Sequence, residues 1–413
     1  MASMRDYGTV TAAYWAFTLT DGALRMLVLL HFHQLGYTPF DIAILFLLYE
    51  AMGIVTNFLG GWIGSRFGLR ITLFSGLAVQ IVALMMLSLV DPTWVAAFSV
   101  GYVMISQALS GIAKDLTKMS SKSAVKLVVS AADHGGLFKW VAVLTGSKNA
   151  LKGVGFLLGG LLLQFFGFQP SLWAMAGMLV LALIVTFMMV TADLGRAKEK
   201  IARRDLFSKT REINFLSAAR IFLFASRDVW FVVGVPIFLY EQLGWRFDQV
   251  GGFMAVWVVG YGIVQAIAPK LLGGNAANSA ARLAKTWALV LLLIPTLIAI
   301  GLIPNGPFQI PAGFDAFVLV GGLLVFGVVF AINSSLHSYL IVAFSDADKV
   351  AMNVGFYYMA NAVGRFGGTL LSGYLYQLHG LTGVLYASSV LISLAVFFTL
   401  PLAGNTHVPS PKK

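Results

Sequence analysis

Apolar residues dominate the chain in long stretches, each near the roughly 20 residues that a helix needs to cross a bilayer. Short polar connections separate these stretches. The hydropathy pattern predicts twelve membrane-spanning helices. They lie near 10–35, 40–62, 70–90, 94–113, 137–166, 171–191, 214–240, 248–272, 286–303, 316–342, 350–378 and 381–402. We therefore predict an all-α, multi-pass membrane protein.

Two kinds of connection alternate between the predicted spans. One kind is short and nearly free of Lys and Arg, around Gly36, Asp91, Phe168, Asn305 and Gly380. The other kind is basic and contains Arg66 and Arg70, Lys114 to Lys126, Arg196 to Arg211, Lys270 to Lys285, and Lys349. Since basic loops stay on the cytoplasmic side, we expect both termini and the long central loop in the cytoplasm.

Composition supports the membrane assignment and excludes several classes of function. The chain is 59% hydrophobic and 11% charged, whereas soluble domains carry about 25% charged residues. The formal net charge of +11 lies largely in the basic loops, so it indicates topology and not a nucleic-acid partner. Cysteine is absent, which excludes disulfides and thiolate metal sites in this sequence. We expect no cofactor and no metal.

The two halves of the chain resemble each other. Asp21 precedes LGYTPFDI (35–42) as Asp228 precedes LGWRFDQV (243–250), and NALKGVGFLLGGLLLQFFG (149–167) matches NAVGRFGGTLLSGYLYQLHG (361–380) with one insertion. Chance similarity between Gly-rich apolar helices is the alternative. Repeated six-helix halves are typical of two-lobed transporters that hold substrate between the lobes near the midplane. The predicted organisation is a six-helix half (1–191), a cytoplasmic loop (192–213), a second half (214–402) and a cytoplasmic tail (403–413).

Charged residues inside the spans are the strongest indication of function, because each costs at least roughly 2.5 kcal/mol at bilayer depth. The acids are Asp21, Glu50 and Asp228. The bases outnumber them and are Arg25, Lys148, Lys152, Arg220, Arg227 and Arg365. Arg offers forked donors to phosphate-type oxygens, and Lys acts as a point charge. This surplus predicts a binding site for a small polyanion such as a phosphate ester, formed by these six bases.

Each base has an alternative role as the partner of an acid. Asp21 and Arg25 are four residues apart, a spacing that satisfies both charges on one helix. Arg227 and Asp228 are adjacent, and adjacent side chains point apart on a helix.

No acid lies near Lys152 or Arg365 in the sequence, so we favour a ligand role for both. Asp21 is predicted to position Arg25 or to carry a coupling proton. Glu50 has no cation near it in the sequence, so it is either a proton carrier or half of an ion pair between helices.

Polar neutral residues in the spans add candidate hydrogen-bonding groups. Asn149 and Asn361 occupy matching positions of the repeat, and His337 lies in the polar stretch INSSLHSY (332–339). These side chains either bind substrate or hold helices together. The metalloprotease HExxH, the nucleotide-binding GxxxxGK[ST] and a catalytic triad are all missing from the sequence, so we predict neither an enzyme nor an ATP-driven pump.

The junction of the second and third spans, GGWIGSRFGLR (60–70), resembles the loop motif of the major facilitator superfamily, G-x-L-a-D-r-x-G-r-k. The matching residues, which form a gating loop in that family, are Gly61, Gly64, Arg66, Gly68 and Arg70. Ser65 stands where the family usually has Asp, which departs from its charge-based gating contact. GVGFLLGG (153–160) resembles part of the span-5 antiporter motif, with Phe156 in place of its proline. This resemblance implies a bundle of twelve helices with two pseudo-symmetric halves.

A closer resemblance is to the ArsJ-type organoarsenical efflux permeases of bacterial arsenic-resistance operons. It is carried by LTDGALRMLVLLHFHQLGY (19–37), FLLYEAMGIVTN (46–57), SGIAKDLTKMSSKSAVK (110–126) and GSKNALKGVGFLLGG (146–160). The resemblance implies export of 1-arseno-3-phosphoglycerate, which glyceraldehyde-3-phosphate dehydrogenase makes when arsenate replaces phosphate. That dehydrogenase is therefore the implied functional partner.

The expected protein is thus a monomeric efflux transporter of the bacterial inner membrane, working by alternating access and exchanging its substrate against protons. Organophosphate antiporters of the same superfamily also use arginines on spans 1 and 7, which is similar to Arg25 and Arg227 here. An organophosphate uptake or exchange carrier is the first alternative. A membrane sensor of phosphorylated metabolites is the alternative from another class.

Overall fold

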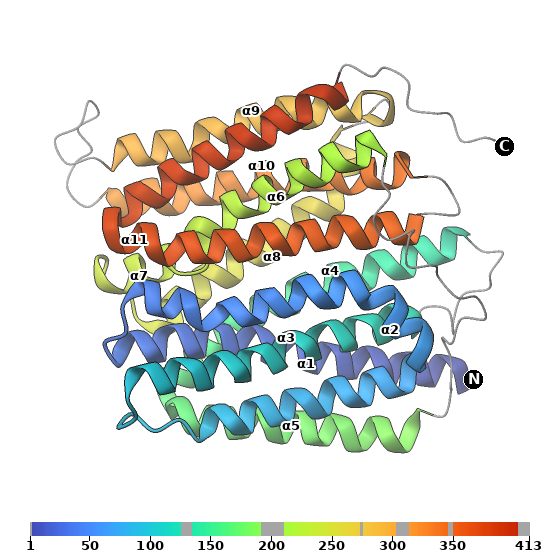
Figure 1. The fold of residues 1–413 in the computed structure, drawn as a ribbon, viewed down its shortest axis with the longest axis vertical. Helices are drawn as coiled ribbons and strands as arrows, with labels where there is room; N and C mark the ends of the chain where they lie inside the picture. The colour runs from blue at the N-terminus through green and yellow to red at the C-terminus, as the bar shows by residue number, and fades with distance from the viewer. Residues whose placement is uncertain are drawn as a thin grey trace. The chain divides into compact units, whose positions relative to one another are not determined.

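The computed structural model describes residues 2–124, 134–190, 210–272, 276–302, 314–345 and 350–403 (Figure 1). Within these ranges, the side chains of 2–3, 60–67, 69, 122–124, 134–146, 269, 276–278, 350–352 and 403 lie outside the description. The predicted central loop and C-terminal tail therefore fall almost entirely outside the described residues.

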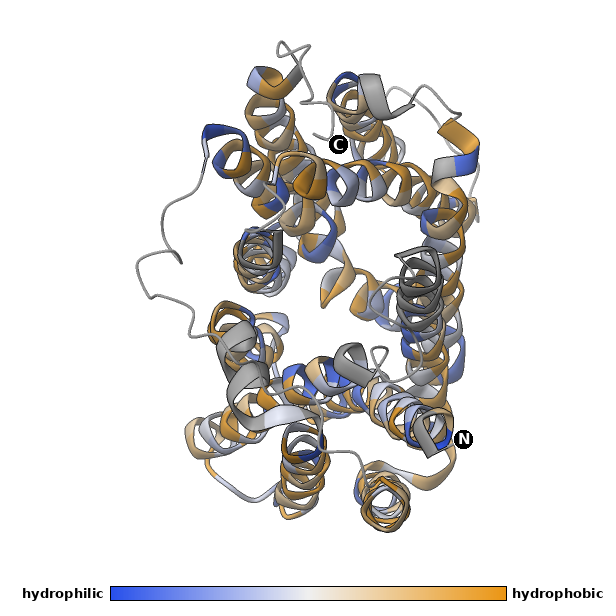
Figure 2. Ribbon diagram, turned by 90° about the vertical axis from the view of Figure 1, so that its right-hand side faces the viewer, coloured by the Kyte–Doolittle hydropathy of each residue, from blue (hydrophilic) through white to orange (hydrophobic). Residues whose placement is uncertain are grey.

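The described chain is helical throughout, with turns between the helices. The helices are α1 (Ala2–Gln34), α2 (Pro39–Ser88), α3 (Ala96–Ala124), α4 (His134–Phe166), α5 (Phe168–Met189), α6 (Arg211–Phe231), α7 (Gly234–Glu241), α8 (Phe247–Leu272), α9 (Ala276–Gly301), α10 (Asp315–Ala343) and α11 (Val350–Ala403). Hydrophobic residues, orange in Figure 2, are distributed along the helices, as an environment of lipid and neighbouring helices requires.

The twelve predicted spans correspond to these helices once two continuous helices are divided. Helix α2 contains two spans that meet at Gly68 (φ 77°), and α11 contains two that meet at Gly380 (φ 60°). By length and composition, ten stretches of the described chain could cross a membrane, and one of them covers both halves of α11. Helix α1 is not among them, and it carries Asp21 and Arg25 in its middle.

One predicted span is interrupted between α6 and α7. Pro236 has no N–H to donate to the carbonyl of Val232, so the helical hydrogen bonding cannot continue there. The amides of Val233 and Gly234 instead donate to Ser372 Oγ on α11, at 3.1 and 3.2 Å. A single hydroxyl therefore satisfies two buried donors at the break.

Helix α3 extends further than hydropathy predicts. The prediction ended near residue 113, because Lys114 and Lys118 were assigned to a cytoplasmic loop. In the structure both lysines lie inside α3, which continues to Ala124. Polar side chains of this extension are buried against α2, so packing and not apolar character determines its length.

The chain divides into two compact units. Unit 1 takes the described residues of Met1–Tyr37, Ile44–Ala202 and Trp245–Val259. Unit 2 takes those of Thr38–Ala43, Arg203–Gly244 and Gly260–Lys413. The first part of α8 thus packs with unit 1, and the first turn of α2 packs with unit 2.

Glycines set the close helix crossings inside each unit. In unit 1, a Cβ on Gly155 of α4 would lie 2.5 Å from the carbonyl oxygen of Leu19 on α1. In unit 2, a Cβ on Gly368 of α11 would lie 2.8 Å from the carbonyl oxygen of Ala225 on α6. These helix pairs therefore approach backbone to backbone, which places polar side chains on their facing surfaces within reach of each other.

Candidate functional site

A buried ion pair joins α1 to α2 in unit 1. Arg25 Nη2 lies 2.5 Å from Glu50 Oε1, and the two side chains are 7% and 1% exposed. The guanidinium carbon also lies 5.2 Å from the ring centroids of Phe46 and Tyr49. The sequence argument that Glu50 lacks a cation is therefore wrong, because packing of α1 on α2 supplies one.

Asp21 has partners other than the predicted Arg25. The Tyr49 hydroxyl donates to Asp21 Oδ1 at 2.6 Å, and Lys152 Nζ on α4 lies 3.5 Å from Oδ2. Lys114 Nζ sits 4.0 Å from the centroid of the Tyr49 ring, and its charge also acts on Asp21. No acid lies near Lys152 in the sequence, but in the fold α1 brings Asp21 next to it.

Another buried acid of unit 1, Asp115, was not selected from the sequence. Asp115 on α3 is 1% exposed, accepts a hydrogen bond from Thr56 on α2, and lies 3.4 Å from Lys118 Nζ. Lys118 in turn donates to Asn57 Oδ1 at 2.8 Å. The Asp–x–x–Lys spacing was visible in the sequence, but assignment of this segment to a loop concealed it.

In unit 2, Asp228 on α6 is held by two arginines. Arg227 Nε donates to Asp228 Oδ1 at 2.6 Å, and Arg365 Nε on α11 donates to Oδ2 at 3.2 Å. The Asp228 side chain is fully buried, whereas those of Arg227 and Arg365 are 14% and 17% exposed. The expectation that adjacent Arg227 and Asp228 point apart is corrected, because the long arginine side chain folds back onto its neighbour. The acid that Arg365 lacked in the sequence comes from another helix.

The two units share this arrangement at matching positions of the predicted repeat. Asp21 corresponds to Asp228, and Lys152 lies next to the position of Arg365. In each unit the acid of one helix contacts the base of the glycine-containing helix packed on it. The aligned segments also end alike, since Gly167 and Gly380 both have positive φ, at 77° and 60°. These correspondences agree with an internal repeat.

Arg220 has only neutral hydrogen-bond partners within the described residues, unlike Arg25, Lys152, Arg227 and Arg365. Its Nε donates to Asn361 Oδ1 at 3.1 Å, and its Nη1 donates to Ser334 Oγ at 3.0 Å. The guanidinium lies over the rings of Phe224 and Tyr357. Asn361 and His337, both predicted from the sequence, lie on the two helices that surround Arg220, whereas Ser334 and Tyr357 were not selected.

The remaining predicted residues have less defined surroundings. Lys148 and Asn149 are partly buried on α4 near Lys152. In the gating loop, Gly61, Gly64 and Arg66 belong to α2, but their side-chain environment lies outside the described residues. Gly68 forms the kink of α2, and the Arg70 guanidinium lies 5.4 and 5.8 Å from the ring centroids of Phe74 and Phe187.

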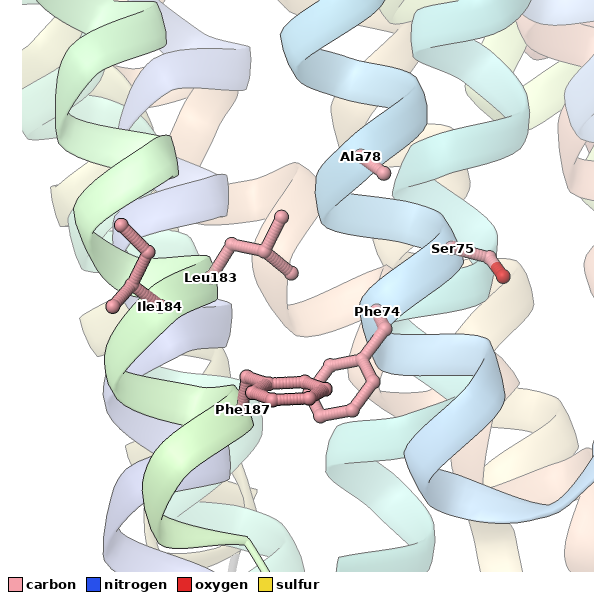
Figure 3. A pocket seen from close by; sticks show the side chains of 6 residues that line it. All are labelled: Phe74, Ser75, Ala78, Leu183, Ile184 and Phe187. Carbon is pink, nitrogen blue, oxygen red and sulfur yellow. The ribbon is translucent and has the colours of Figure 1, made fainter.

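An apolar groove of about 470 Å³ lies between α2 and α5 (Figure 3). Its lining residues are Phe74, Ser75, Ala78, Leu183, Ile184 and Phe187. Figure 3 shows the two phenylalanine rings meeting across it. None of these side chains is charged, so the groove does not suit a polyanion. Among the described residues, no group of His, Asp and Glu side chains has the arrangement of a metal site.

A helical bundle with acids and bases buried in its membrane-spanning segments defines a multi-pass membrane transport protein. Residues 10–336 match the Major Facilitator Superfamily, so the chain belongs to this family of secondary transporters and is not an enzyme. A solved structure described as "Structural insights into substrate recognition in proton dependent oligopeptide transporters" superposes with a TM-score of 0.68. It is 13% identical, and the match covers 98% of each chain, which shows the shared fold. No curated protein matches the sequence.

Proposed function

We propose that this transporter exports a small organic polyanion, and that the anion is 1-arseno-3-phosphoglycerate. The observation that carries the proposal is a charge surplus inside the helices of unit 2. Among the described residues, Arg220, Arg227 and Arg365 lie in the interior of its membrane-spanning helices with one acid, Asp228. Buried cations without equal negative charge are costly, and an anionic substrate lowers that cost when it binds. The resemblance to organoarsenical permeases supplies the identity of the anion.

The bases divide into two groups by their surroundings. Arg25 is buried against Glu50 and so stabilises the packing of α1 on α2. Lys152, Arg227 and Arg365 are partly exposed, so they can turn from their carboxylates toward a substrate. We therefore place substrate binding on these three residues and Arg220, with Lys148, Asn149, Asn361 and His337 as further contacts.

The same pairs suggest how protons enter the cycle. When substrate takes Lys152 or Arg365, the buried carboxylate of Asp21 or Asp228 loses its counter-ion and is favoured to take up a proton. Protons bound in this way move in the same direction as the substrate. This favours symport, whereas the sequence analysis expects antiport, the exchange of substrate against protons. The membrane potential then drives the anion outward, and it contributes about 2.3 kcal/mol per 100 mV for each net negative charge that crosses.

Measuring arsenic in arsenate-exposed bacteria tests the proposal. Cells would carry the transporter, glyceraldehyde-3-phosphate dehydrogenase, both or neither. We expect accumulation to fall only when both are present. The Lys152→Gln variant should lose this protection, whereas Arg282→Gln, which alters an exposed arginine of α9, should retain it. Unchanged accumulation with a transporter that reaches the membrane would exclude the arsenical substrate. Increased uptake of phosphorylated metabolites would instead identify an organophosphate carrier.

A further inference from the structure

Arg220 of α6 is surrounded by neutral side chains within the described residues. Its side chain is buried, at 4% exposed. Its Nε–H binds Asn361 Oδ1 and its Nη1 group binds Ser334, through Oγ at 3.0 Å and the carbonyl at 3.4 Å. Within the described residues, Nη2 makes no hydrogen bond. A buried guanidinium with a vacant donor edge is suited to accept an anion.

Aromatic side chains also contact Arg220 without neutralising its charge. The Arg220 guanidinium carbon is 3.9 Å from the ring centroid of Phe224 and 4.8 Å from that of Tyr357. The Tyr261 hydroxyl lies 3.3 Å from Ser334 Oγ. Ring faces attract a cation but leave its full charge in place. Within the described residues, no carboxylate forms an ion pair with Arg220, so its positive charge remains available to an anion.

Two further polar atoms lie buried beside Arg220 without a hydrogen bond. They are His337 Nδ1 and the Tyr357 hydroxyl oxygen, on side chains that are each 1% exposed. His337 lies three residues after Ser334 on α10, and Tyr357 lies four residues before Asn361 on α11. Residues at these spacings share a helix face. Both orphan groups are thus on the faces that already contact Arg220, and a buried polar group without a partner destabilises the fold.

We infer that Arg220, Ser334, His337, Tyr357 and Asn361 form a subsite for one tetrahedral oxyanion group, a phosphate or an arsenate ester. The guanidinium supplies the charge and the free Nη2 donors, and the tyrosine hydroxyl and histidine ring supply further hydrogen bonds. In the first repeat the position of Arg220 falls on Ala12 or Ala13, so the subsite occurs once, in unit 2. The inference rests on the proposed function only in taking this oxyanion as part of the transported anion.

The decisive variant is Asn361→Asp. It changes Oδ1, the atom that Arg220 Nε contacts at 3.1 Å, into a carboxylate oxygen of the same shape. The variant therefore supplies the missing negative charge internally and should fold at least as stably as the parent. It should also compete with any external anion. A purely structural Arg220 would gain stability from this change without any effect on anion binding.

The test measures binding of inorganic phosphate, arsenate and 3-phosphoglycerate to the purified full-length protein at constant ionic strength. Titration calorimetry and ligand-induced shifts in the melting temperature give the affinity. We expect Asn361→Asp and Arg220→Gln to bind each anion about 10-fold or more weakly, and the exposed-site control Arg282→Gln to bind as the parent does. If Arg220→Gln fails to fold, Asn361→Asp decides alone.

Parent-like affinity in Asn361→Asp would overturn the subsite, and so would a parent protein that binds none of the three anions. The outcome for arsenic export is separate. Oxyanion binding that depends on Arg220, without export from cells, would retain the subsite and reject the arsenical function. Export that persists in Asn361→Asp would reject the subsite and retain the function.

Discussion

Lys152 Nζ lies 3.5 Å from Asp21 Oδ2, between α4 and α1 of unit 1. Unit 2 repeats this relationship, with Arg365 Nε of α11 3.2 Å from Asp228 Oδ2 of α6. In both units the acid is buried and the base is partly exposed. The acid is thus fixed inside the protein, while the base can reach a ligand. Under the proposed function, this arrangement links substrate binding at the base to the charge state of the buried carboxylate.

Loss of Asp228 should destabilise the protein more than loss of Asp21. Asp228→Asn leaves two arginines, Arg227 and Arg365, without their shared counter-ion, and breaking a buried pair in this way costs about 3–5 kcal/mol. Asp21→Asn removes the counter-ion of Lys152, which lies at the longer distance of 3.5 Å. Thermal unfolding of the purified variants should therefore give the lower melting temperature for Asp228→Asn.

Asp315→Asn is the matched control, since this aspartate is exposed at the start of α10. Its melting temperature should equal that of the parent. Equal melting temperatures for Asp228→Asn and Asp21→Asn would contradict the inference that Asp228 neutralises more buried positive charge than Asp21 does.

Double variants should separate the structural ion pair from the functional one. Arg25→Gln and Glu50→Gln should each destabilise the protein, and their combination should restore both stability and transport, because this pair is buried at 2.5 Å. Asp21→Asn combined with Lys152→Gln should restore stability but not transport. Melting temperature and arsenic accumulation, measured on the same four single and two double variants, give both readouts.

Transport by the Asp21→Asn, Lys152→Gln protein at the parent rate would show that this pair is structural as well. Failure of the Arg25→Gln, Glu50→Gln protein to transport, despite restored stability, would return Arg25 to the substrate site.

The membrane-spanning segments were predictable because they depend on local properties of the chain. Apolar length identified the spans, and Gly68 and Gly380 mark the turns within α2 and α11. The extension of α3 was missed, since Asp115 and Lys118 look like loop residues until α2 covers them. Hydropathy measures transfer to lipid, and it does not recognise a polar face that is buried against another helix.

Several of the buried bases and acids were also identified from the sequence, although Asp115 was not, and most of the pairings were not predicted. Glu50 finds Arg25 and Lys152 finds Asp21 through contacts between helices far apart in the chain. Spacing along one helix favoured Asp21 with Arg25, a pairing that tertiary packing replaced. The repeat was the useful signal, because it placed Lys152 next to the position of Arg365 before any contact was known.

Removal of the Ser372 hydroxyl should destabilise the junction of α6 and α7. Ser372 Oγ accepts hydrogen bonds from the buried amides of Val233 and Gly234. Ser372→Ala leaves both donors unsatisfied, at a cost of about 1–3 kcal/mol for each donor. Thermal unfolding should therefore show a lower melting temperature, whereas Ser393→Ala, at an exposed serine bonded within its own helix, should leave it unchanged. A parent-like Ser372→Ala protein would mean that water replaces the hydroxyl.

Two neighbouring glycines of α11 provide a sharp test of the close packing that positions Arg365. A Cβ on Gly368 would lie 2.8 Å from the carbonyl oxygen of Ala225 and 2.9 Å from Asp228 Cβ, whereas a Cβ on Gly367 meets nothing within 4 Å. Gly368→Ala should therefore push α11 away from α6, lengthen the contact between Arg365 and Asp228, and cost about 1–3 kcal/mol. Gly367→Ala should stabilise the helix by about 0.5–1 kcal/mol. Comparing melting temperature and transport in these two variants isolates the helix crossing from the general effect of adding a methyl group. Equal behaviour of the two would show that the approach of α11 to α6 does not set the geometry of the ion pair.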